Sequence, residues 1–163
     1  MENIPKLKLT LTDWIVELLA LLLVLFSWVI MFINYKQLPE TIASHFDSFG
    51  KANGFSSKES IIALPIISTL LFIGLSVLNK YPHSFNIPVV ITESNVLKQY
   101  TYATRLLRFL KLSLTTIFFI LLNSIINSAK KETMDISPWL LPLVLLLVFI
   151  PIIIYFIVAR KNN

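Results

Sequence analysis

The chain contains no cysteine, and only two of its 163 residues are histidines. Disulfide bonds, thiol catalysis and metal sites built from cysteine are therefore excluded. The sequence also lacks a glycine-rich phosphate loop, a zinc-ligand spacing and an arrangement of serine, histidine and aspartate that would suit a nucleophilic enzyme. These absences predict a protein that is not an enzyme and that needs neither a metal nor another cofactor.

Charged side chains are also scarce, at 14% of the residues, against about 25% in ordinary soluble domains. Hydrophobic residues make up 56% of the chain and gather in long runs, which a bilayer would cover and a soluble fold could not. The net charge of +5 suits basic flanks beside a membrane, so nucleic acid is not expected as a partner. We expect an all-α integral membrane protein, a single domain over residues 1–163, in the cell membrane.

Four transmembrane helices are predicted, at about residues 13–35, 60–78, 112–127 and 138–158. Thr10 and Asp13 resemble a capping box before the first helix, and Ser56 and Glu59 have the same spacing before the second. The third helix is expected to begin near residues 92–95 and to span roughly 50 Å, which exceeds the ~30 Å hydrocarbon core. Its basic first part should therefore extend into the cytoplasm.

Lysine and arginine are divided unevenly between the segments that would lie on the two sides of the membrane. Nine of the fourteen fall in the N-terminus, the connector 79–111 and the C-terminus, and five fall in the two other loops. The positive-inside rule then predicts that both termini lie in the cytoplasm. The loop 37–59 is accordingly expected to face outward.

This outer loop holds the polar features best suited to recognising a ligand. His45 could fix the loop by a hydrogen bond, contact a ligand or partner, or join Asp47 in a metal site. Phe46, Phe49 and Phe55 could pack over the helix ends, or they could form an aromatic landing site for an amphipathic peptide.

Glu17 is an ionisable residue inside the first hydrophobic run, where an unpaired charge is costly. Arg105 and Arg108 lie on the same predicted side of the membrane, three residues apart on one helical face. We expect an intramembrane ion pair of Glu17 with Arg105 or Arg108, which would hold the first helix against the third. A role in moving a proton or ligand, or simple exposure, is the alternative.

Two stretches resemble a known family. Leu38-Pro39, His45-Phe46, Gly50 and Lys58 resemble the pattern of the bacterial domain of unknown function 1648, and residues 85–107 resemble the connector that follows it in small Gram-positive membrane proteins. The chain departs from the pattern at Ala43-Ser44, where a proline is usual before the histidine. It departs again at Asn53, where an acid is common.

The domain forms the N-terminal part of immunity proteins against the sporulation-delaying killing peptide. The resemblance therefore implies a small membrane immunity or resistance protein of a Gram-positive bacterium. Such a protein would recognise a membrane-active toxin peptide, or a membrane protein that the peptide targets, and would hold a cytoplasmic regulator at Arg105 and Arg108. The residues implied in the outer contact are Leu38, Pro39, His45, Phe46, Gly50 and Lys58.

Two other functions remain open. Proline-containing helices and Glu17 would suit a transporter or transporter subunit, which would need a dimer or a partner chain. The basic helix would suit a membrane signalling subunit that passes occupancy of the outer loop to a cytoplasmic regulator. Besides the lipid bilayer, the expected partners are thus a toxin peptide or membrane protein and a cytoplasmic regulator.

Overall fold

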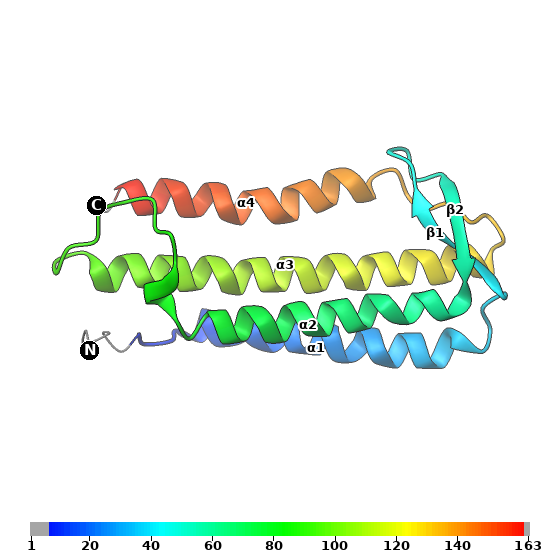
Figure 1. The fold of residues 1–163 in the computed structure, drawn as a ribbon, viewed down its shortest axis with the longest axis horizontal. Helices are drawn as coiled ribbons and strands as arrows, with labels where there is room; N and C mark the ends of the chain where they lie inside the picture. Colours follow the sequence, from blue (N-terminus) through cyan, green and yellow to red (C-terminus); the bar gives the residue numbers. More distant parts are fainter. Residues whose placement is uncertain (1–6, 162–163) are drawn as a thin grey trace.

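The computed structural model describes residues 7–161, which form four long helices and a small β-hairpin. The elements in order are α1 (Leu11–Tyr35), β1 (Thr41–Phe46), β2 (Ala52–Ser57), the 3-10 helix η1 (Lys58–Ile62), α2 (Ala63–Leu78), the 3-10 helix η2 (Pro82–Ser84), α3 (Val96–Lys130) and α4 (Leu140–Lys161). The long helices run side by side (Figure 1). The hairpin lies at one end of the bundle, called the hairpin end. The start of α1 and the end of α4 lie at the other, called the terminal end.

The prediction of a helical, multi-pass membrane protein is confirmed. Four helices are long and apolar enough to cross a membrane: Leu11–Tyr35, Lys58–Leu78, Val96–Lys130 and Leu140–Lys161. The third helix has 35 residues and is thus roughly 50 Å long. At the terminal end it extends past the start of α1 (Figure 1).

The helix starts agree with the predicted signals in part. Thr10 N donates to Asp13 Oδ2 at 2.8 Å and Asp13 N donates to Thr10 Oγ1 at 3.4 Å, so the capping box of α1 is present. The second predicted box is wrong, because Ser56 is still paired within β2 and the cap of η1 is Ser57, which makes no side-chain capping bond. Ser56 Oγ instead lies 2.6 Å from Ser60 Oγ.

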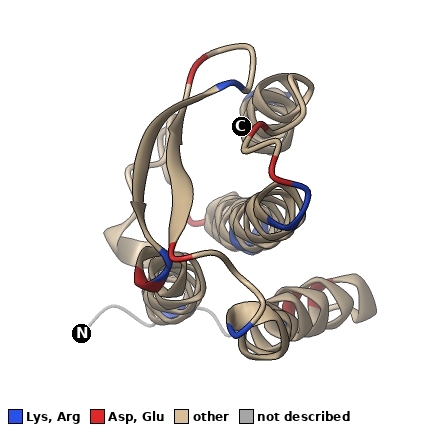
Figure 2. Cartoon of the chain, turned by 90° about the vertical axis from the view of Figure 1, so that its right-hand side faces the viewer, with Lys and Arg blue, Asp and Glu red and all other residues tan. Residues whose placement is uncertain are grey.

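The central element of the bundle is α3. The other three long helices all pack against it, and α4 lies on the opposite side of α3 from α1 and α2 (Figures 1 and 2). The larger cluster of buried apolar residues is at the hairpin end and comprises Met31, Leu38, Ile42, Ile61, Leu122, Ile125, Ile126 and Ala129. A smaller one, Ala103, Tyr155 and Ala159, joins α3 to α4 near the terminal end. Most other large apolar side chains of α1 and α4 are exposed on the bundle surface, where lipid would cover them.

The outer loop, expected to be ordered, contains an antiparallel β-hairpin that was not predicted. Its strands pair from Thr41 opposite Ser57 to Phe46 opposite Ala52, with register irregularities around His45. Each strand has only six residues, and neither shows a regular alternation of apolar and polar side chains. The period-2 signal that identifies a strand from sequence is therefore missing.

The hairpin turn depends on Asp47 and Gly50. Asp47 Oδ1 accepts hydrogen bonds from Phe49 N at 2.8 Å and Lys51 N at 3.0 Å, which closes a short Asx turn. Gly50 has a φ of 81°, a conformation that glycine adopts without steric cost. Its carbonyl accepts from Ile136 N at 2.9 Å, so the turn is bound to the loop between α3 and α4.

Replacement of Gly50 by alanine should loosen this attachment. A Cβ at Gly50 would lie 2.3 Å from Ile136 O and would hold a strained φ. We expect Gly50→Ala to lower the free energy of unfolding by roughly 1–3 kcal/mol, measured by thermal unfolding in detergent micelles. Gly74→Ala is the matched control, because nothing lies within 4 Å of a Cβ there. Equal unfolding temperatures for the two variants would contradict the role given to Gly50.

Candidate functional site

Two regions hold the polar and charged side chains that could take part in binding: the hairpin and a charged cluster between α1 and α3. The charged cluster consists of Asp13, Glu17, Arg105, Arg108 and Lys111. Figure 2 shows the hairpin end facing the viewer, with acidic and basic positions marked along the chain. The two regions are at opposite ends of the bundle, and α3 contacts both.

Four of the six residues expected to contact an outer ligand are engaged within the protein. Leu38 is buried in the core cluster, and Phe46 packs partly against it. Gly50 is buried against the α3–α4 loop. Lys58 Nζ lies 2.6 Å from Glu40 Oε1. Leu38 and Phe46 thus attach the hairpin to the helices, and Gly50 attaches its turn to the α3–α4 loop. The Lys58–Glu40 pair joins the two ends of the hairpin.

The other two expected contacts, Pro39 and His45, are exposed. His45 Nδ1 is hydrogen-bonded to Asn53 Oδ1 across the hairpin, so the ring donates from Nδ1. Gly54 faces His45 in the register, and a Cβ on Gly54 would lie only 2.9 Å from His45 Cβ. Over residues 7–161, no group of three or more histidine, aspartate or glutamate side chains could hold a metal ion. The hydrogen bond to Asn53 holds the ring of His45 in a defined orientation.

The hairpin end carries strongly exposed aromatic side chains. Phe49 and Phe55 are 73% and 56% exposed, and Trp139 at the start of α4 is 77% exposed. The hairpin turn lies beside the start of α4, and a cavity of about 140 Å³ separates them. Trp139 was not singled out in the sequence, although a tryptophan flanking a hydrophobic run is typical of the membrane interface.

In the charged cluster, Glu17 contacts Arg108, one of its two expected partners. Arg108 Nε lies 3.5 Å from Glu17 Oε1, an ion pair without hydrogen-bond geometry. The shorter contact is to Lys111, whose Nζ lies 2.6 Å from Glu17 Oε2. Arg105 pairs instead with Asp13, at 3.2 Å from Nε to Oδ1. Arg108 also approaches Asp13, at 3.8 Å, so the three cations of the charged cluster all face acids of α1.

Lys111 joins three helices. Its side chain is 1% exposed, and its ammonium donates to Glu17 Oε2 on α1 at 2.6 Å and to Ser76 Oγ on α2 at 2.7 Å. The same ammonium lies 4.9 Å from the ring centre of Phe72, also on α2. The sequence did not predict this role, because Lys111 falls in the basic first part of the third helix, which was expected to extend into the cytoplasm. Its spacing of three residues from Arg108 was the available signal.

The two arginines expected to contact a cytoplasmic regulator differ in accessibility. Arg108 is buried between Asp13 and Glu17, so little of its guanidinium is accessible to another protein. The Arg105 side chain is 36% exposed, and its Nη2 donates to Thr10 Oγ1 at 3.4 Å. Arg105 is thus the accessible member of the charged cluster.

Comparison with known proteins bears on the hairpin region. Residues 22–69 match the family model Domain of unknown function (DUF1648), which confirms the resemblance of the stretch from Leu38 to Lys58, whereas residues 85–107 lie outside the match. The matched segment contains most of α1, the whole hairpin and the first part of α2. An uncharacterized protein of Archaeoglobus fulgidus is 31% identical over 94 residues, which cover 53% of this chain and 51% of that protein. The chain therefore spans about half the length of this relative, which is archaeal. No solved structure matches the chain.

Removal of the Glu17 charge should destabilise the bundle. Glu17→Gln would leave Lys111 buried with its charge unmatched, and we expect a loss of about 3 kcal/mol in unfolding free energy, measured by denaturant titration in mixed micelles. The double variant Glu17→Gln/Lys111→Met should recover much of it, because the buried ammonium is removed together with its acid and Arg108 keeps Asp13 as a partner.

Glu40→Gln is the control for this series. It also breaks a 2.6 Å lysine–glutamate pair, but the Glu40 side chain is 85% exposed, so its loss should stay below about 1 kcal/mol. If Glu17→Gln were no more harmful than Glu40→Gln, the charged cluster would not hold the helices together.

Proposed function

We propose that this protein with a DUF1648 domain is a small membrane immunity or resistance protein that binds a membrane-active peptide, or the target of that peptide, through its hairpin. Binding would protect the membrane without chemistry on the peptide. The observation that carries the proposal is a firmly anchored hairpin with exposed aromatic side chains. The proposal also takes the hairpin end to face outward and both termini to lie in the cytoplasm, as the distribution of lysine and arginine predicts.

The anchoring supports a binding role because a fixed surface loses less conformational entropy when a ligand binds. Ile42 is 1% exposed and inserts into the core cluster beneath β1. On the far side of the hairpin, Ala52 N donates to Asp135 Oδ1 at 3.0 Å, beside the bond from Ile136 N to Gly50 O. The hairpin is thus attached both to the helix bundle and to the α3–α4 loop.

The exposed side chains suit an amphipathic peptide. Phe49 on the turn and Phe55 on β2 present large apolar surfaces that the protein itself leaves uncovered. Aromatic residues supply much of the binding energy at protein interfaces. A peptide that partitions to the membrane surface would meet these rings with its own apolar face, and the polar hairpin backbone would remain in water.

Loss of the two rings should abolish protection. In a Gram-positive host sensitive to membrane-active peptides, expression of the wild-type chain should raise the inhibitory concentration of at least one peptide in a panel. Phe49→Ser/Phe55→Ser should return it to the level of the empty host at equal protein abundance. Val90→Ser is the control, because Val90 is 75% exposed but lies in the connector at the terminal end. Unchanged killing of cells that express the wild type would count against an immunity function.

His45 offers a second test, which separates a ligand contact from a structural role. His45→Ala and Asn53→Ala remove the same hydrogen bond. If the ring contacts the ligand, His45→Ala should lower protection severalfold while Asn53→Ala has a smaller effect. An equal effect of the two variants on protection, with equal thermal stability, would limit His45 to orienting the hairpin.

A further inference from the structure

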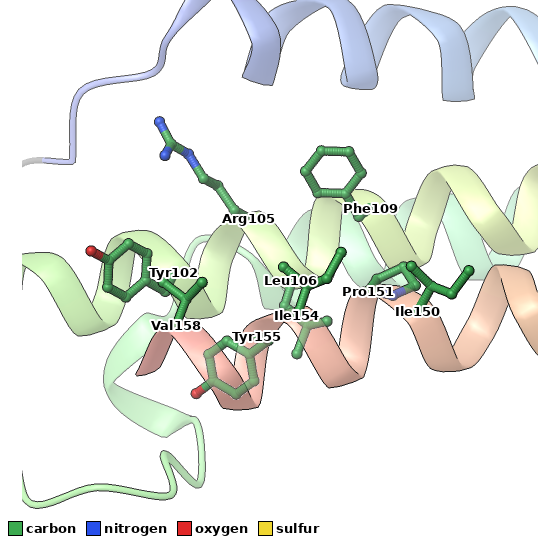
Figure 3. Close-up of a pocket in the computed structure, with 9 residues that line it drawn as sticks. All are labelled: Tyr102, Arg105, Leu106, Phe109, Ile150, Pro151, Ile154, Tyr155 and Val158. Carbon is green, nitrogen blue, oxygen red and sulfur yellow. The ribbon is translucent and has the colours of Figure 1, made fainter. Parts of the chain in front are cut away.

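A groove between α3 and α4 opens to the bundle surface in the half nearest the terminal end. Its volume is about 440 Å³, within the range of roughly 300–1,000 Å³ typical of ligand sites. It is lined by Tyr102, Arg105, Leu106, Phe109, Ile150, Pro151, Ile154, Tyr155 and Val158 (Figure 3). The α4 residues of the groove, 150–158, lie in the predicted fourth span, and its α3 residues, 102–109, lie in the part of that helix expected to extend into the cytoplasm. The groove is therefore at the level of the membrane surface, where a lipid of the adjoining leaflet can enter it.

Its polar and apolar groups are segregated along the helix axis. Leu106, Phe109 and Ile150 lie in the part nearer the membrane centre, and the hydroxyl groups of Tyr102 and Tyr155 point toward the terminal end (Figure 3). The Arg105 guanidinium extends from the rim of the groove toward α1 (Figure 3). A molecule that fits this gradient has a long apolar tail and a polar head at the level of the membrane surface.

A second cavity continues the site toward α1. It has a volume of about 260 Å³ and is lined by Thr10, Thr12, Asp13, Arg105 and Phe109. Arg105 and Phe109 line both cavities, so the apolar groove and the polar cavity meet at these two side chains. The polar cavity offers the hydroxyl of Thr12 and the guanidinium of Arg105, which are donors that phosphate groups favour, whereas the Thr10 hydroxyl already donates to Asp13 Oδ2 at 2.7 Å.

The charge of the cluster favours an anion in this place. Its three cations, Arg105, Arg108 and Lys111, face only two carboxylates, those of Asp13 and Glu17. The hydrogen bonds of Arg105 to α1 use Nε and Nη2, and among the described residues Nη1 has no hydrogen-bond partner. A phosphodiester carries one negative charge, so it would balance the excess cation despite the nearby Asp13.

We propose that this groove binds an anionic phospholipid of the leaflet at the terminal end, with an acyl chain between α3 and α4 and the phosphate at Arg105. The site is independent of the proposed peptide recognition, because it lies at the opposite end of the bundle from the hairpin. Basic pockets between spanning helices are a recurrent way of binding anionic headgroups. The bound chain would fill the space beside Pro151, where α4 lacks one backbone hydrogen bond and packs against α3 alone among the long helices.

The test is retention of lipid by the full chain, measured by native mass spectrometry after exchange with phosphatidylglycerol or phosphatidylcholine that carry identical acyl chains. The wild type should retain phosphatidylglycerol about tenfold more tightly, as expected for one charge-assisted contact. Arg105→Gln should abolish this preference and Arg105→Lys should keep most of it. Lys98→Gln, an exposed cation on the same helix, is the control and should keep it fully.

A second variant tests the acyl chain without altering the charge. Ile154→Trp would fill the groove and should lower the retention of both lipids, while the unfolding temperature stays near that of the wild type. Equal retention of the two lipids by the wild type would overturn the proposal, as would equal effects of Arg105→Gln and Lys98→Gln. Conversion of a dimer to a monomer by Ile154→Trp, with lipid retention unchanged, would assign the groove to a second copy of the chain instead.

Discussion

The arrangement of α1, α2 and α3 depends on the buried ammonium of Lys111. In a bilayer, burying apolar side chains between helices gains little, because lipid tails are equally apolar. A buried charge behaves differently, since leaving it without a partner in hydrocarbon is costly. Lys111 is satisfied only when Glu17 on α1 and Ser76 on α2 both reach it, at 2.6 Å and 2.7 Å. A rotation of either helix about its axis would break one of these contacts, so the single side chain specifies the register of three helices.

The position of α4 follows from its absence from this network. Among the described residues, α4 contributes no member of the charged cluster, and its apolar core contacts with α3 are the small cluster around Ala159. One polar contact assists them: Gln99 Nε2 donates to Ala159 O at 3.0 Å near the terminal end. At the hairpin end, the loop before α4 is bound to Gly50 and Ala52. The helix is therefore fixed near its two ends, and the groove opens along the stretch between them.

The sequence predicted the features that depend on local patterns. Hydrophobic length gave four spans and the long third helix, and the Thr10–Asp13 spacing gave the start of α1. Because an unpaired charge in the membrane is costly, the sequence predicted a cationic partner for Glu17 on α3. It pointed to Arg105 or Arg108 and did not identify Lys111. The reason is geometric: helical spacing shows which residues share a face, whereas the depth of each cation depends on how far α3 slides along α1. The residue pattern of a single helix does not specify how far it is shifted along its neighbour.

The contacts within the hairpin were likewise not predictable from local sequence patterns. Asp47 and Gly50 signal a turn, but the His45–Asn53 bond depends on a register that is irregular around His45. The sequence around His45 therefore could not identify its partner.

The contacts of the hairpin show which residues of the family pattern have a structural role. Leu38 is buried in the core, Gly50 packs against the α3–α4 loop and Lys58 pairs with Glu40, so these three residues hold the hairpin in place. The exposed side chains of this region include Pro39 and His45, which belong to the pattern, and Phe49 and Phe55, which lie outside it. The match to the domain therefore bears on how this end of the molecule is built, and the proposed recognition of a ligand rests on the side chains that this chain leaves exposed there.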